Sequence, residues 1–112
     1  MLALWLGARA TAFHVITTFR EMCDHHGLSP GGVFSFTRDI TATGPLSMLF
    51  HPRNNAYHLT HHLLPAIPYY RLPEAQRVFA TLPEYQERAR VCKGYFAGSG
   101  PAVALWQRGP VR

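Results

Sequence analysis

Apolar residues dominate the first nineteen positions of the chain, and polar residues interrupt them only at intervals. Leu2 to Phe19 reads LALWLGARATAFHVITTF and contains no proline. An apolar helix needs roughly 20 residues to cross a bilayer, so the length fits. Arg9 and His14 nevertheless make it a weak spanning helix on hydropathy alone. A signal peptide fits less well, because no basic region precedes the apolar run. We predict a membrane helix over residues 1–26.

The polar side chains of this predicted helix form a stripe. At about 100° per residue, one narrow arc contains His14, Thr18, Glu21 and His25. Arg20 and Asp24 lie toward the other side, at the i, i+4 spacing of an ion pair. Ionisable groups in membrane helices usually face the bundle interior. The alternative is a soluble amphipathic helix whose polar stripe faces water.

The pattern becomes irregular over residues 27–53. Gly27 suits the position just after a helix, and Pro30 prevents continuation. The residues from 31 to 50 favour a loop or hairpin with some extended character, broken at Gly44 and Pro45. His51 precedes Pro52, and we interpret it as a structural or exposed residue.

Helical patterning returns after a proline-rich break at residues 65–68. Pro73 suits the first turn of a helix that runs to about Thr81. The sequence TLPE at 81–84 has the pattern of a capping box, which predicts a second helix to about Lys93. Within it, Glu84–Arg88 and Glu87–Arg90 are helix-compatible pairs. We expect a mainly α fragment over 1–98, with a partial transmembrane helix (1–26), a loop (27–53), a histidine segment with cytosolic cap helices (54–98), and a loose tail (99–112).

Charge and cysteine content narrow the function classes. The net charge is +5, and ten of the eleven basic residues are arginines spread from Arg9 to Arg112. No cluster or motif accompanies them, so we exclude nucleic acid as a partner. Ten basic residues follow Phe19, which predicts a cytoplasmic C-terminal region. Cys23 and Cys92 have no metal-ligand spacing and fit buried, reduced thiols.

Three histidines within one short segment are the strongest chemical signal. His58, His61 and His62 stand at i, i+3 and i+4, which on a helix places the three imidazoles on one face. Imidazole is the commonest protein ligand for transition metals. Apolar and aromatic residues surround the three, which favours a shielded site. The spacing predicts a metal site without naming the metal, since zinc, copper, iron and nickel all accept imidazole.

The segment YHLTHHLLPAIPYYRLP, residues 57–73, resembles the third histidine box of integral-membrane fatty acid desaturases. Many relatives carry Glu where this chain has Thr60, outside the ligand positions. Upstream, REMCDHHG at 20–27 resembles the R-x-x-x-E-H-x-G segment of these enzymes, with Asp24 in place of Glu. Thr37-Arg38 resembles their S/T-R-T segment.

The resemblance implies a membrane enzyme that uses two irons, O2 and an electron donor to place a double bond in an acyl chain. It implies metal ligands at His25, His58, His61 and His62. Supporting hydrogen bonds could come from Glu21, Asp24, Asn54, Asn55 and Tyr57, although a turn explains the asparagines equally well. The implied partners are a lipid bilayer, the acyl substrate and a carrier of ferredoxin or cytochrome b5 type.

The first two histidine boxes of such enzymes are absent, so we expect the C-terminal part of a desaturase, inactive alone. Two alternatives stay open. One is a sister di-iron oxygenase, such as a carotenoid ketolase or an alkane hydroxylase. The other is a non-catalytic metal-binding membrane remnant.

Overall fold

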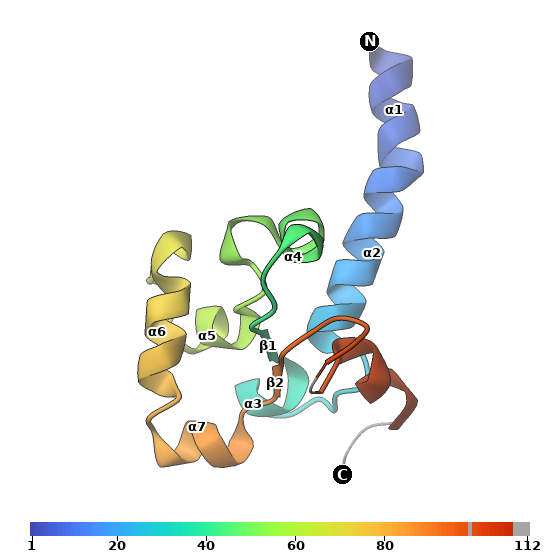
Figure 1. The fold of residues 1–112 in the computed structure, drawn as a ribbon. Helices are drawn as coiled ribbons and strands as arrows, with labels where there is room; N and C mark the ends of the chain where they lie inside the picture. The colour runs from blue at the N-terminus through green and yellow to red at the C-terminus, as the bar shows by residue number, and fades with distance from the viewer. Residues whose placement is uncertain (99, 109–112) are drawn as a thin grey trace.

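A helical rod at the N-terminus stands away from the rest of the molecule (Figure 1). The computed structural model describes residues 1–98 and 100–108. The rod consists of α1 (Leu2–Ala10) and α2 (Ala12–His25), which meet at Thr11 with non-helical dihedrals of φ −121° and ψ −101°. Its residues Leu2–His25 are long and apolar enough to cross a membrane by length and composition, with a mean hydropathy of 1.2.

The lower end of α2 enters the protein body. The helix ends at His25, as predicted, and Gly27 follows with φ +75°, a conformation that glycine adopts without a Cβ clash. Cys23 and Asp24 are buried. The predicted Arg20–Asp24 ion pair was wrong, because Asp24 faces the core and pairs with His51 at 3.0 Å, while Arg20 pairs with Glu21 at 3.1 Å.

The connecting region 27–53 contains more helix than its sequence predicted. It forms α3 (Val33–Phe36), β1 (Asp39–Ile40), α4 (Pro45–Phe50) and the 3₁₀ helix η1 (Pro52–Asn54). The loop or hairpin assignment was therefore wrong for α3 and α4, and the extended character was confirmed at β1. Pro45 opens α4 at its first position, where the missing N–H costs no hydrogen bond.

The C-terminal half begins with α5 (His58–Leu63), which carries the histidine box. The 3₁₀ helix η2 (Tyr69–Arg71), α6 (Leu72–Phe79) and α7 (Pro83–Arg88) follow. The helix predicted from Pro73 was confirmed. The capping box was wrong, because α7 begins at Pro83 with Leu82 as its N-cap residue and no side chain caps it; the Thr81 hydroxyl donates to the Val78 carbonyl at 2.7 Å. The helix predicted to Lys93 ends at Arg88, and Glu84–Arg88 pairs at 2.6 Å.

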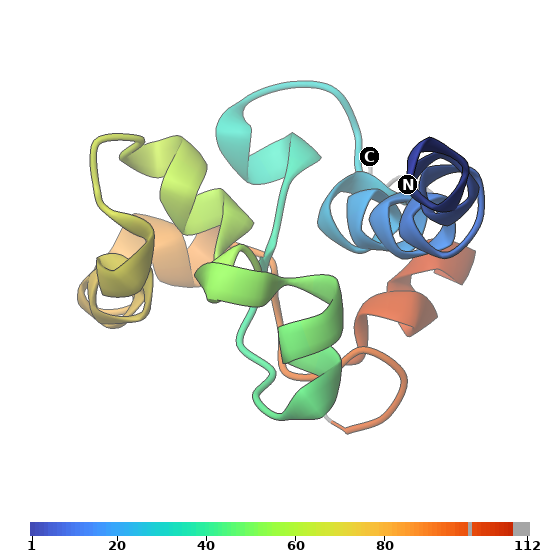
Figure 2. The ribbon, with the colours of Figure 1, turned by 90° about the horizontal axis from the view of Figure 1, so that it is seen from above.

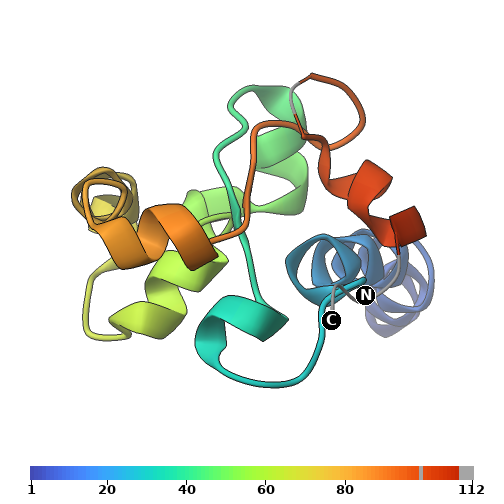
Figure 3. The ribbon, with the colours of Figure 1, turned by 90° about the horizontal axis from the view of Figure 1, so that it is seen from below.

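A short parallel strand pair ties the two halves together. β2 (Val91–Cys92) runs beside β1, with Asp39 opposite Val91 and Ile40 opposite Cys92. Seen from above and from below, the α1–α2 rod lies on one side of this pair, and α6 and α7 lie on the other (Figures 2 and 3). The extended backbone that pairs with β1 is the physical reason why α7 cannot continue beyond Ala89.

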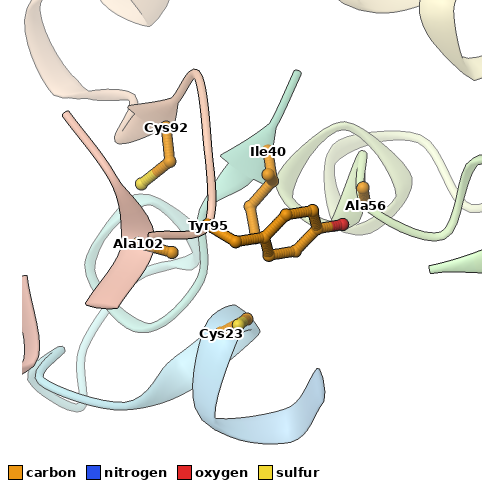
Figure 4. Packing of buried hydrophobic residues seen from close by; sticks show 6 residues of the cluster. All are labelled: Cys23, Ile40, Ala56, Cys92, Tyr95 and Ala102. Carbon is orange, nitrogen blue, oxygen red and sulfur yellow. The ribbon is translucent and has the colours of Figure 1, made fainter. Parts of the chain in front are cut away.

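The buried core draws single residues from many segments. Its members come from α2, β1, the turn before α5, β2 and the residues after it: Cys23, Ile40, Ala56, Cys92, Tyr95 and Ala102 (Figure 4). Leu105 and Trp106 also pack against it. The loose tail expected over 99–112 was therefore wrong for its described part, where η3 (Ala102–Arg108) begins with the fully buried Ala102. Positions 99 and 109–112 of that expectation lie outside the described residues.

Candidate metal centre

Three histidines from two helices converge beside the lower end of the rod. His25 ends α2, whereas His58 and His62 stand one turn apart on α5. Each offers a ring nitrogen, and the three nitrogens all lie within 4.8 Å of one another. The Nε2 atom of His58 lies 3.1 Å from Nε2 of His25 and 3.1 Å from Nε2 of His62. The convergence of His25 with the box was predicted from sequence, and the structure places these residues together.

Phe36 fixes the orientation of His25. The backbone carbonyl of Phe36 lies 2.7 Å from Nδ1 of His25, so Nδ1–H donates to it and the Nε2 lone pair is left for the cluster. The Phe36 ring stacks on the His25 ring at 5.9 Å and meets the His62 ring edge-on at 5.4 Å. Hydrogen bonds of this kind set the tautomer and ring angle of metal-binding histidines.

Burial favours the neutral form of two histidines on α5, His58 and His62. It lowers the pKa of His58 from 6.5 to about 4, with Asp24 acting in the opposite direction and the neighbouring imidazoles adding to the decrease. The pKa of the more exposed His62 is also lowered, by burial and by His61 and His25. A neutral imidazole has the free lone pair that metal coordination requires.

The nitrogen geometry fits a transition-metal ion. With metal–nitrogen bonds of about 2.1 Å, two ligands at right angles have nitrogens about 3.0 Å apart. The two separations of 3.1 Å match this value. Imidazole donors alone suit iron, zinc, copper and nickel. The chain therefore presents one three-nitrogen face, open on the side of the exposed His62.

His61 lies outside this three-nitrogen group. It is exposed, and its ring centre lies 5.8 Å from that of His62 and 6.5 Å from that of His58. Three histidines at i, i+3 and i+4 share one broad helix face, but that face spans enough arc for His61 to point away from His25. The fourth predicted ligand is thus not brought to the same point.

The residues expected to support the ligands have other contacts. Glu21 is exposed and pairs with Arg20, and Asp24 accepts from His51. Asn54 donates to the Tyr69 carbonyl at 3.1 Å, which ties η1 to η2 in the manner of a structural turn. Asn55 is exposed, and Tyr57 is the half-buried residue immediately before α5.

Sequence reasoning missed the residues that hold the cluster in place. Phe36 acts through a carbonyl, which every residue possesses, so no side-chain signal identifies it. Asp39 is fully buried and accepts from the backbone N–H of Thr60 at 3.0 Å, its hydroxyl at 2.5 Å and the Tyr85 hydroxyl at 2.6 Å. Thr60, where many relatives carry Glu, therefore has a structural role of its own in this chain. A glutamate there would set a second carboxylate against buried Asp39.

The sequence of this chain was compared with known protein families. The family model described as fatty acid desaturase matches residues 1–92. The chain belongs to the fatty acid desaturase family. That family consists of membrane-bound, iron-dependent oxidoreductases of lipid metabolism. Searches of curated proteins and of solved structures gave no match.

The family match covers both helices that bear the cluster. It includes α2 and α5, together with β1 and β2. A shallow surface depression of about 360 Å³ is lined by Thr18, Glu21, Met22, His25 and His26, of which only His25 belongs to the three-nitrogen group. Thr18 and Glu21 belong to the polar stripe of the rod. The polar stripe of α2 thus ends at His25, one of the three clustered histidines.

Proposed function

We propose that this chain supplies part of the di-iron centre of a desaturase that introduces a double bond into an acyl chain. The observation that supports this most strongly is the contact between His25 and His58, whose Nε2 atoms lie 3.1 Å apart although 33 positions separate them in the sequence. Segments that resemble two separate desaturase motifs thus meet at one point. An accidental histidine box would have no reason to meet the end of α2.

In this proposal His25, His58 and His62 bind one iron. His61, exposed on the same helix, is the candidate ligand for the second iron, whose other ligands the described residues do not provide. The acyl chain approaches from the bilayer, and electrons come from a carrier of ferredoxin or cytochrome b5 type. The C-terminal region lies on the cytoplasmic side, where such a carrier has access.

Bound iron would supply the oxidising chemistry with O2 that an unactivated C–H bond requires, because such a bond offers neither an acidic proton nor an electrophilic centre. The chain's own residues prepare the site. Phe36 holds the His25 proton on Nδ1, and burial keeps His58 unprotonated. The Phe36 ring covers one side of the imidazoles and limits access of water.

Anaerobic Fe²⁺ titration of the full chain in detergent micelles tests the ligand set. We expect His25→Ala and His58→Ala each to abolish or greatly weaken binding, since a three-ligand site loses a third of its donors. The matched control is His26→Ala, which removes an exposed imidazole adjacent to His25. Equal loss in His25→Ala and His26→Ala, or unchanged binding in His58→Ala, would contradict the assignment.

Expression in a desaturase-deficient host tests the acyl-chain chemistry. We expect no unsaturated lipid from these 112 residues alone, and restored unsaturation when a polypeptide that supplies the remaining histidine boxes is expressed with them. In that paired expression, His58→Ala should remove the unsaturated product. Hydroxylated or keto products instead of alkenes would favour a sister oxygenase.

A further inference from the structure

The first turn of α5 is held by a residue from another segment. Helix starts leave backbone N–H groups without intrahelical acceptors, and a side chain just before the helix usually accepts from one of them. The residue before α5, Tyr57, makes no such bond. Instead the Arg38 carbonyl accepts from the N–H of Leu59 at 3.2 Å, and the Asp39 carboxylate accepts from the N–H of Thr60 at 3.0 Å.

Asp39 is buried, so its carboxylate depends on hydrogen bonds from the protein. Its side chain is fully buried, as is that of Thr60, and Tyr85 is 4% exposed. A buried carboxylate is tolerated only when hydrogen-bond donors replace water. Three donors do so here: the Thr60 N–H, the Thr60 hydroxyl and the Tyr85 hydroxyl. Burial still raises the pKa of Asp39 above its usual value, against the effect of these donors.

The same short segment holds both halves of the histidine cluster. Phe36 accepts from His25, and three residues later Asp39 accepts from α5. Between them the chain passes from α3 into β1. The backbone N–H of Asp39 donates to the carbonyl of Arg90, the residue just before β2, at 2.9 Å. A shift of α5 along its axis would break the bonds from Thr60 to Asp39 and would also change the separation of the His58 and His25 nitrogens, now 3.1 Å.

We propose that Asp39 is a positioning residue for the metal centre. Through Thr60 it fixes α5 relative to the Phe36-bound His25, and so sets the separation of the His25 and His58 nitrogens. This inference rests on the proposed metal-binding function. The residue it names, Asp39, is not a proposed metal ligand. Asp39 acts on the metal centre through its hydrogen bonds from the backbone N–H and the hydroxyl of Thr60.

Co²⁺ is a suitable probe because its visible absorption reports ligand geometry as well as occupancy. We titrate the full chain in detergent micelles and compare Asp39→Asn with the wild type. The amide has the same shape, but its NH₂ group faces hydrogen-bond donors. We expect the Kd for Co²⁺ to rise about tenfold or more, the range found for residues that support metal ligands. The visible spectrum should also change.

A second pair of variants keeps the test decisive if Asp39→Asn does not fold. Thr60→Ser keeps the hydroxyl and should bind Co²⁺ with the wild-type spectrum. Thr60→Val has the same shape without the hydroxyl and should reproduce the loss. Phe50→Leu controls for stability, because Phe50 packs on Phe19 and Tyr95 in the core, away from Asp39. It should lower the unfolding midpoint and leave the Co²⁺ spectrum unchanged.

The outcomes separate the two proposals. Wild-type binding that survives unchanged in Asp39→Asn and Thr60→Val would overturn the positioning role and leave the metal-site proposal intact. A wild-type chain that binds no Co²⁺ would overturn both. A weakened Kd with an altered spectrum in Asp39→Asn and Thr60→Val, but not in Thr60→Ser or Phe50→Leu, supports the proposal.

Discussion

At His58, burial and metal coordination favour the same protonation state. A histidine in water is partly protonated near pH 6.5 and competes with metal for its lone pair. Burial removes that competition, since it lowers the pKa of His58 to about 4. The same shift makes the stability of the metal-free protein depend on pH.

We expect the metal-free chain to lose about 2 kcal/mol of unfolding free energy between pH 7 and pH 5 through His58. The unfolded chain binds a proton at about pH 6.5 and the folded chain only at about pH 4, so the unfolded state gains protons first as the pH falls. Urea titration in micelles at both pH values measures this. His58→Gln cannot be protonated there and should lose this part of the dependence; an equal slope in both proteins would contradict the pKa shift.

At the scale of elements, the end of α2 decides where His25 lies. Gly27 has φ +75°, and a Cβ at this position would lie 3.0 Å from the Leu105 carbonyl oxygen of η3. The helix therefore stops where a left-handed residue and a close backbone approach coincide. Both conditions favour glycine.

Gly27→Ala should destabilise the protein by about 1–3 kcal/mol, through left-handed strain and displacement of η3. The matched control is Gly7→Ala on α1, where an added Cβ meets nothing within 4 Å. That change should be neutral or stabilising by up to about 1 kcal/mol, because alanine favours helix. Thermal unfolding followed by circular dichroism measures both. Equal effects of the two substitutions would contradict the contact between Gly27 and η3.

At the scale of the whole molecule, an exposed apolar rod is joined to a small folded body. All of α1 is exposed, including Leu4 at 75% and Trp5 at 57%. An uncovered apolar surface of this kind is costly in water and normally contacts another protein or a membrane. Membership of a membrane-bound family favours the membrane.

The two tryptophans allow a direct test of this placement. Trp106→Phe leaves Trp5 as the only tryptophan, and Trp5→Phe leaves Trp106, which packs in the body against Phe19. In vesicles we expect emission from Trp5 to shift to shorter wavelengths and to be quenched by brominated lipid, because α1 inserts. Emission from Trp106 should show little quenching. The reverse order of quenching would place the body, not the rod, in the bilayer.

Several elements could be predicted from sequence because their signals are local. Helix periodicity, Gly27 and Pro73 act over a few residues, so the end of α2 and the start of α6 were found, whereas Gly44-Pro45 was interpreted as a break although Pro45 opens α4. Glu84–Arg88 was found for the same reason. Short helices such as α3 carry too few residues for a pattern. The capping box failed because α7 begins one residue later than predicted, with the apolar Leu82 at its N-cap position.

The sequence alone determined which residues could bind a metal and which family the chain resembles, because both depend on residue types and on their spacing along the chain. Only the tertiary structure decided that His58 and His62, but not His61, join His25, that Phe36 accepts from His25 and Asp39 from Thr60, and that η3 packs on the core. Those contacts join residues from 11 positions apart (His25 and Phe36) to 87 positions apart (Phe19 and Trp106), and backbone carbonyls, a buried carboxylate and scattered core side chains carry no periodic signature.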